Sequence, residues 1–256
     1  MAKINARTKK NIIFITALVL AAAVFITSAV MLVLRLLPDT YDYDRFKTVT
    51  TDKVIQVGEK GENPIDFEKL QNHNSDVCAW IMVDGTEIDY PVLRPGSDAD
   101  NEFYLNHNLD KEKQIAGSIY MEKGNSADFS DPNTVIYGHN MLNGSMFAAL
   151  KKFRNADFFK ENKYIYIFVP GHVYKYHIIS AFVYDDRHIL NSFNCYIAAG
   201  MEAYVEACIN PASLVKNVRQ LTVNTDDKLI TLSTCTSKKK ERYLVVAKLI
   251  EDIETK

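Results

Sequence analysis

The sequence predicts a mainly β domain, closed or nearly closed into a barrel with short helices, preceded by an N-terminal transmembrane helix. Seven or eight short strand-like runs are separated by turn signals, and only brief helical stretches lie among them. These runs do not alternate strictly with helices, which disfavours a doubly wound parallel sheet. The N-terminal stretch is apolar enough and long enough to form a helix of its own.

The N-terminus has the pattern of a membrane anchor. Residues 1–10 form a basic tip without acidic residues, and residues 11–34 are 24 residues without a charge. A helix crosses a bilayer core with about 20 apolar residues. A cleaved signal peptide is the alternative, but its apolar region usually has only about 7–15 residues. We therefore expect a single-pass anchor over residues 11–37 in the cell membrane, with the basic tip cytoplasmic and the rest extracellular.

The charge balance argues against one class of partner. Residues 1–35 hold five of the 30 Lys and Arg and none of the 32 Asp and Glu, so the remainder has 25 basic and 32 acidic residues, a formal charge of −7. Such a domain has no electrostatic basis for binding nucleic acid. We interpret residues 38–62 as an extracellular spacer, in part helical, and residues 63–256 as one domain with a full core.

The elements of this domain follow from periodicity and turn signals. An Asp-Gly pair at residues 84–85 predicts a β-hairpin, and residues 170–172 join the strands of a second one. In chain order, strands are predicted at residues 80–83, 87–93, 117–122, 133–137, 164–169, 173–184, 228–236 and 242–250. Helical character is predicted at residues 63–74, 145–153 and 194–209.

Four cysteines in an exported domain raise the question of a disulfide. Cys195 and Cys208 lie within the predicted helix 194–209, along which their separation is about 20 Å, whereas bridged Cα atoms lie at most about 7 Å apart. We therefore expect no bridge between them. Cys78, Cys195 and Cys208 are interpreted as small buried apolar residues.

Cys235 differs from the other cysteines in its surroundings. It ends the run Thr231-Leu232-Ser233-Thr234-Cys235, and Arg242 begins the next predicted strand. His139 lies just past the predicted strand 133–137. A nucleophilic cysteine needs a nearby cation or base to hold it as thiolate, and a donor for the oxyanion that forms on attack at an acyl carbon. Cys235, His139 and Arg242 together indicate thiol acyl-transfer chemistry.

Other polar residues carry weaker signals. Lys238 to Lys240 either add positive potential near Cys235 or form a solvated hairpin tip. Asp98, Asp100 and Glu102 are interpreted as a solvated acidic loop, so no metal and no organic cofactor is expected. His188 is expected to be an exposed loop residue without substrate contact. The remaining histidines, His73, His107, His172 and His177, have no chemical context.

The segments Tyr137-Gly138-His139-Asn140-Met141 and Leu232-Ser233-Thr234-Cys235-Thr236, followed by the single Arg242, resemble a sortase, and specifically a class B sortase. The resemblance covers residues 63–250, and the membrane anchor fits it. It implies an eight-stranded β-barrel and a transpeptidase that joins secreted proteins bearing a C-terminal sorting signal to the Gram-positive cell wall.

The resemblance also implies roles for single residues. Cys235 would form a thioester with the Thr carbonyl of the sorting signal, and Arg242 would hold that carbonyl and stabilise the oxyanion. His139 would protonate the leaving amine and then accept a proton from an amine of peptidoglycan or its lipid-linked precursor. Tyr137, Ser233, Asn101 and Leu105 match positions that line the family's groove.

Several alternatives stay open at this point. Nothing in the residues themselves separates transfer to an amine from hydrolysis. A pilus-type sortase that joins pilin subunits and a catalytically silent, membrane-tethered binding module are the rival interpretations. Only six residues separate Cys235 from Arg242, which is short for the class. The loop between them is therefore either a tight hairpin, or Arg242 lies differently against the thiol.

Overall fold

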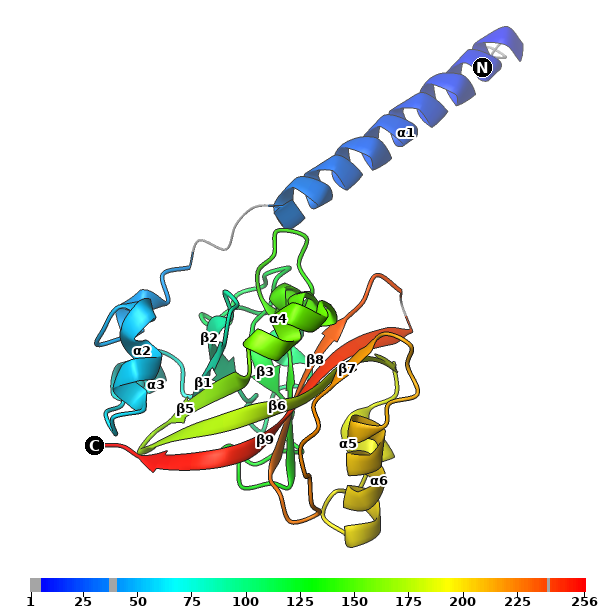
Figure 1. Ribbon diagram of the computed structural model, residues 1–256. Coiled ribbons are helices and arrows are strands. Elements are labelled where there is room, and N and C mark those ends of the chain that lie inside the picture. Colours follow the sequence, from blue (N-terminus) through cyan, green and yellow to red (C-terminus); the bar gives the residue numbers. More distant parts are fainter. Residues whose placement is uncertain (1–5, 37–40, 239) are drawn as a thin grey trace. The chain divides into compact units, whose positions relative to one another are not determined.

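A computed structural model describes residues 6–36, 41–238 and 240–256 of the chain. The chain divides into two compact units, the first ending at Pro38 and the second extending from Asp39 to the C-terminus (Figure 1). Lys239 of the lysine run and the first five residues of the basic tip lie outside the described residues.

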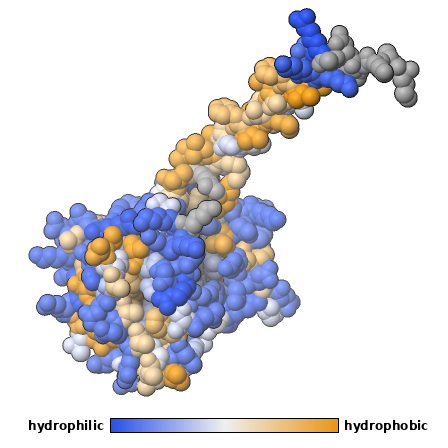
Figure 2. Space-filling view, turned by 90° about the vertical axis from the view of Figure 1, so that its right-hand side faces the viewer, coloured by the Kyte–Doolittle hydropathy of each residue, from blue (hydrophilic) through white to orange (hydrophobic). Residues whose placement is uncertain are grey.

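The first unit is a single long helix, α1 (Ala6–Leu36). Its stretch Lys9–Val33 is 25 residues long and apolar enough to cross a membrane, and none of its most apolar part is buried by protein. Apolar residues cover the visible face of this helix in Figure 2, and Phe25 is 74% exposed. A helix that is apolar all round requires an apolar environment. Helix α1 therefore suggests a membrane anchor, as the sequence predicts.

The second unit is built on one sheet of nine strands among the described residues. The strands are β1 (Val77–Val83), β2 (Asp89–Leu93), β3 (Ile119–Met121), β4 (Asn133–Tyr137), β5 (Tyr164–Val169), β6 (His172–Asp185), β7 (Lys216–Val218), β8 (Leu229–Cys235) and β9 (Glu241–Glu254). Their order is β5-β1-β2-β3-β4-β8-β9-β6-β7, and β5 also pairs with β6. This last pairing closes eight strands into a barrel, with β7 outside the ring at the edge of β6.

The closed eight-stranded barrel confirms the predicted fold class. The one strand that the sequence did not indicate is β7, which pairs with residues Ser180, Ala181 and Phe182 of β6. Its three residues, Lys-Asn-Val, are too few to show the alternation by which strands are recognised. Tertiary pairing alone makes this segment a strand.

Short helices surround the barrel (Figure 1). They are η1 (Asp44–Phe46), α2 (Thr51–Gly58), α3 (Phe67–His73), η2 (Phe103–Leu105), η3 (Phe147–Arg154), α4 (Ala156–Glu161), α5 (Ile189–Ser192) and α6 (Ala198–Ile209). The predicted helix at residues 145–153 is the 3₁₀ helix η3, and the predicted helix at 63–74 is shortened to α3.

The predicted spacer at residues 38–62 requires correction. From residue 41 onward this segment packs on the barrel: Phe46 and Val54 are buried together with Trp80 on the outer face of β1. Helices α2 and α3 lie beside β1 and β5 in Figure 1. Strand β1 is buried along its whole length because the barrel core covers one of its faces and this N-terminal segment covers the other. The domain thus begins well before residue 63.

Cys195 lies outside the helix in which the sequence predicts it. Helix α6 begins at Ala198, so Cys195 lies before it rather than within it. The chain turns there, with Ile197 donating its N–H to the Asn194 carbonyl at 3.2 Å. The conclusion holds nevertheless, because Cys78, Cys195 and Cys208 are all buried and free.

Candidate active site

Strand pairing brings the predicted catalytic residues to one edge of the barrel. Strands β4 and β8 run parallel with Tyr137 opposite Ser233, so the residues two positions further on, His139 and Cys235, leave these neighbouring strands at the same end. Strands β8 and β9 are antiparallel with Cys235 directly opposite Arg242. Such directly paired residues have Cα atoms about 4.5–5.5 Å apart. The thiol and the guanidinium therefore start from neighbouring backbone positions.

Hydrogen bonds fasten the His139 segment to the Cys235 segment. The Gly138 N–H donates to the Ser233 carbonyl at 3.2 Å, and the buried Thr234 hydroxyl donates to the Gly138 carbonyl at 2.7 Å. The side-chain amide of Asn140 donates to the Cys235 carbonyl at 2.9 Å. These hydrogen bonds hold residues 138–140 against residues 233–235.

The imidazole of His139 is oriented by the main chain. Its Nε2 lies 2.7 Å from the Leu105 carbonyl oxygen. A carbonyl only accepts hydrogen bonds, so Nε2 carries a proton in this contact, and Nδ1 is the nitrogen left to exchange one. The His139 carbonyl accepts from Phe147 N–H at 2.9 Å, which fixes the backbone of the same residue. His139 is thereby placed as a proton donor and acceptor at Nδ1.

Cys235 is the exposed member of the four cysteines. Burial raises the pKa of Cys78 to about 12 and that of Cys195 to about 11. Burial also raises the pKa of Cys208. Those three thiols are therefore held in the unreactive neutral form, and only Cys235 can meet a substrate from solvent.

The loop between Cys235 and Arg242 is a tight hairpin. Thr236 N–H donates to the Glu241 carbonyl at 3.2 Å, and Lys238 Nζ lies 3.0 Å from Glu241 Oε1. The Lys238 side chain is 75% exposed, which makes this described part of the lysine run a solvated tip. Arg242 donates to the Glu241 carbonyl at 3.3 Å and forms no ion pair with any carboxylate in the described part of the chain. Its charge is available to a bound carbonyl group.

A cavity of about 250 Å³ lies at this edge of the barrel. Six of the predicted groove and catalytic residues line it: Leu105, Tyr137, His139, Ser233, Cys235 and Arg242. Asn101 is not among the lining residues, and its side-chain oxygen accepts from Lys123 N–H at 3.3 Å. The structure therefore brings six of the seven predicted site residues together around one cavity.

The cavity also contains polar residues that sequence reasoning missed. His188, expected as an exposed loop residue, is instead half-buried in the cavity wall, where its Nε2 lies 2.8 Å from the carboxylate of the buried Glu122. The expectation failed because the partner of His188 is 66 residues away in the sequence. The sequence did contain a signal for Glu122, because it is a charged residue at the end of the otherwise uncharged predicted strand 117–122.

Aromatic residues line the remainder of the cavity. Tyr137 stacks on Tyr120 with ring centroids 5.5 Å apart. Burial raises the pKa of Tyr137 and of Tyr184, so each phenol keeps its proton and can donate a hydrogen bond. The Tyr184 hydroxyl oxygen is buried and has no hydrogen-bond partner among the described residues. An unpaired buried polar group is costly, and a bound ligand would satisfy it.

Known proteins resemble this chain in sequence and in structure. Residues 81–250 match the family model of the Sortase domain. Sortase B of Listeria monocytogenes is 35% identical over 214 residues, which cover 81% of this chain and 83% of that protein. A mutant form of Clostridium perfringens sortase B has a TM-score of 0.69 and 32% identity, covering 84% of this chain and all of that one. A Staphylococcus aureus sortase B–substrate complex has a TM-score of 0.65 and 26% identity, covering 78% of this chain and 91% of that one.

Proposed function

This chain belongs to the sortase family, and on that premise we propose that Cys235, His139 and Arg242 are its catalytic residues. Its relatives make it a class B sortase, a cysteine transpeptidase that anchors surface proteins to the cell wall. The observation that carries the residue assignment is the strand register, with Cys235 opposite Arg242 and with His139 leaving the adjacent parallel strand at the same edge.

In the first half-reaction, the thiolate of Cys235 attacks the carbonyl carbon of the Thr residue in a C-terminal sorting signal. The carbonyl π electrons move to its oxygen, and Arg242 stabilises the resulting oxyanion. The C–N bond then breaks, and the leaving amine takes a proton from Nδ1 of His139. A thioester joins the secreted protein to Cys235. Removing one oxyanion donor typically costs about 10²–10³ in kcat.

In the second half-reaction, an amine of peptidoglycan or its lipid-linked precursor attacks the thioester carbon. His139 Nδ1, now unprotonated, accepts a proton from this amine. The C–S bond breaks, a new amide forms, and Cys235 returns as thiolate. The proton that His139 gives in the first step is thus recovered in the second.

The cavity supports binding of the signal peptide along Leu105, Tyr137 and Ser233. The unpaired hydroxyl of Tyr184 is suited to a polar group of that peptide. Asn101, outside the cavity lining, would contact the peptide only at the approach to it. The membrane would hold the enzyme through α1, with the N-terminus cytoplasmic and residues from 38 onward extracellular, which follows from the basic tip before an uncharged span.

The test is turnover of a panel of quenched fluorescent sorting-signal peptides by the full chain in detergent micelles, beside Cys235→Ala. Each peptide is run alone, with a peptidoglycan stem-peptide amine, and with a pilin-type lysine peptide. Cleavage that depends on Cys235, with a stem-peptide adduct in the mass spectrum, supports the proposal. An adduct formed only with the lysine peptide would favour the pilus-type enzyme. Activity retained by Cys235→Ala would refute the assignment of the nucleophile.

A further inference from the structure

The atom that orients His139 belongs to the backbone. Leu105 ends the 3₁₀ helix η2, 34 residues before His139, and its carbonyl oxygen receives the Nε2 proton at 2.7 Å. The Leu105 side chain does not determine where this oxygen points. The direction of the carbonyl depends on whatever holds the peptide unit between residues 105 and 106.

The residue before Leu105 is fixed on two sides. Tyr104 is fully buried, and its hydroxyl donates to Asp76 Oδ2 at 2.6 Å and accepts from Asn74 Nδ2 at 3.0 Å. Its carbonyl accepts from Ser118 N–H at 2.9 Å. The side chain and the main chain of Tyr104 are therefore both anchored, immediately before the carbonyl that contacts His139.

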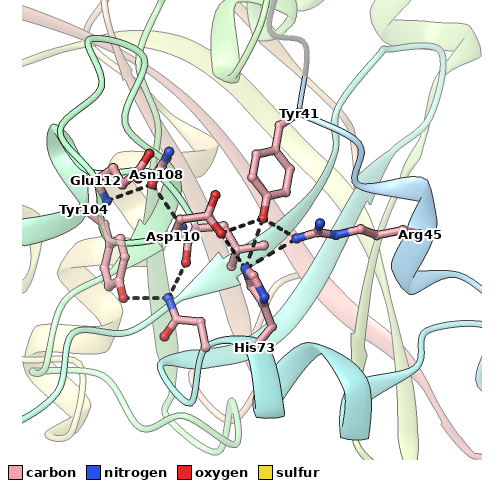
Figure 3. A network of polar contacts seen from close by, with 9 residues as sticks. Tyr41, Arg45, His73, Tyr104, Asn108, Asp110 and Glu112 are labelled. Carbon is pink, nitrogen blue, oxygen red and sulfur yellow. Dashed lines mark hydrogen bonds and ion pairs between the residues drawn. The ribbon is translucent and has the colours of Figure 1, made fainter.

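The segment that runs from Leu105 to Gly117 is also anchored to residues from the start of the domain (Figure 3). The Tyr41 hydroxyl donates to Asp110 Oδ1 at 3.0 Å, and His73 Nε2 lies 2.5 Å from the same oxygen. Asn74 Nδ2 donates to the Leu109 carbonyl at 2.8 Å. The segment therefore has little freedom to move as a whole. An added atom that clashes with it would displace the nearby carbonyl groups rather than the whole segment.

Gly117 is the residue at which an added side chain would clash with these carbonyl groups. It is buried and has a φ of +57°, and a Cβ atom built on it would lie 2.4 Å from the Leu105 oxygen and 2.6 Å from the Tyr104 oxygen. Real Cβ atoms do not approach that closely, and the neighbours are backbone atoms rather than flexible side-chain tips. Only glycine allows the chain to pass this close to the two carbonyls.

We propose that Gly117 is a positioning residue for the catalytic histidine: its missing side chain lets the Leu105 carbonyl meet Nε2 of His139, which leaves Nδ1 to exchange the proton. The inference rests on the proposed role of His139. Any side chain at position 117 displaces the Leu105 oxygen, and the imidazole then loses its only hydrogen-bond acceptor among the described residues.

The test compares Gly117→Ala with Gly171→Ala in the full chain. Gly171 is the matched control, because its φ of +83° carries the same left-handed backbone cost while a Cβ atom there meets nothing within 4 Å. We expect Gly117→Ala to lower kcat by about 10- to 100-fold with KM changed less than about twofold, since small misplacements of catalytic groups cost about that much. Gly171→Ala should retain wild-type kcat and wild-type KM.

Equal kcat and equal KM values for the two glycine variants would overturn the proposal. So would an activity loss in Gly117→Ala that is explained fully by a smaller folded fraction in thermal unfolding. If Gly117→Ala does not fold, nitrogen-15 NMR of the wild-type His139 ring decides, with His139→Gln as the assignment control. A ring protonated at Nε2 with a slowly exchanging proton, whether or not Nδ1 is protonated as well, supports the inference, and protonation at Nδ1 alone contradicts it.

The failure of this inference is distinguishable from failure of the proposed function. Activity that persists in His139→Gln removes the catalytic assignment on which the inference rests. An inactive His139→Gln beside identical Gly117→Ala and Gly171→Ala enzymes removes only the role of Gly117.

Discussion

At the scale of single residues, solvent exposure distinguishes the Cys235 thiol from the other three cysteine thiols. Cys235 is exposed at the C-terminal end of β8, whereas Cys78 is in the barrel core, and Cys195 and Cys208 are in the buried cluster that α6 forms with the sheet. Chemical reactivity follows from this difference, because a thiolate must form and must be reached by the electrophile. The sequence context of Cys235 anticipated this result, and burial supplies the physical reason.

We predict that a small thiol reagent labels one cysteine in the native protein at pH 8 and four after unfolding. Cys195, with its pKa raised to about 11, and Cys78, with a pKa of about 12, remain neutral at this pH. Intact-mass spectrometry counts the labels, and native Cys235→Ala should take up none. Labelling of a second cysteine before unfolding would contradict the burial seen here.

Arg242 gives a second prediction at this scale. Arg242→Ala should lower kcat about 10²–10³-fold, because an oxyanion donor is lost. Arg242→Lys should recover little, since an ammonium cannot reproduce the fixed fork of a guanidinium. The matched control is Lys240→Ala, which removes an exposed cation from the same hairpin and should leave kcat within a factor of about two. Similar losses in the two alanine variants would indicate a general electrostatic effect instead.

At the scale of elements, an ion-pair contact joins the loop from β6 to α5 to the end of β3. His188 precedes α5 and lies 2.8 Å from the carboxylate of Glu122, which follows β3. Both residues line the cavity, so this contact helps to hold the cavity wall in place.

We predict that His188→Ala raises KM for the signal peptide several-fold and changes kcat less than about twofold. The reason is that the loop loses its attachment to Glu122 while Cys235 and its surroundings stay intact. The control is His172→Ala, which breaks a similar pair with Asp252, 2.7 Å long, on strands away from the cavity. Steady-state kinetics on one peptide measures both constants. A pure kcat effect in His188→Ala would place this histidine in the chemistry.

The loop between β3 and β4 supplies a pH prediction. Burial alone raises the pKa of Asp131, but hydrogen bonds from Tyr196, Ser126 and Asn125 outweigh it and lower this pKa below its usual 3.8. A lowered pKa in the folded state means stability that is present above pH 3.8 and is lost as pH falls through the folded value. Asp131→Asn should therefore destabilise the protein by about 1–3 kcal/mol at pH 7 and by less at pH 3.

Urea unfolding at the two pH values measures this difference. Asp226→Asn, at an exposed carboxylate, is the control and should change the unfolding free energy by less than about 0.5 kcal/mol at either pH. An Asp131→Asn effect that is as large at pH 3 as at pH 7 would show that packing, rather than the ionised carboxylate, carries the stabilisation.

At the scale of the whole molecule, the domain is larger than its sequence pattern suggested. The segment that follows α1, from residue 41 onward, is part of the barrel's outer packing, with Phe46 and Val54 against the face of β1 that carries Trp80. The only tryptophan of the chain is fully buried there. Its indole N–H donates to Asp89 Oδ1 at 2.6 Å.

We predict that deleting residues 1–38 leaves the unfolding midpoint unchanged, whereas deleting residues 1–60 lowers it and shifts Trp80 fluorescence to longer wavelength. The second deletion removes Phe46 and Val54 and exposes the apolar face beneath them. Phe46→Ala should cost about 3–5 kcal/mol, as for other large buried side chains. Denaturant unfolding followed by tryptophan emission measures both effects. An unchanged emission maximum after the longer deletion would refute this packing role.

Much of the fold and the site could be predicted from the sequence because their signals are local. The uncharged span, the alternating strands and the Asp-Gly turn each depend on neighbouring residues, and strands at residues 133–137 and 164–169 coincide with β4 and β5. The Gly-His and Ser-Thr-Cys segments with the following Arg242 are likewise short and contiguous. Such patterns alone indicated the barrel, the anchor and the chemistry.

Only the tertiary structure decided the remaining features. The burial of Phe46 on β1, the pairing of β7, the His188–Glu122 contact and the approach of Gly117 to the Leu105 carbonyl all join segments that are not contiguous in the chain. Contacts of this kind depend on shape and distance after folding rather than on residue type at a fixed spacing. A local pattern can therefore identify the reactive residues, but only packing between distant segments positions them.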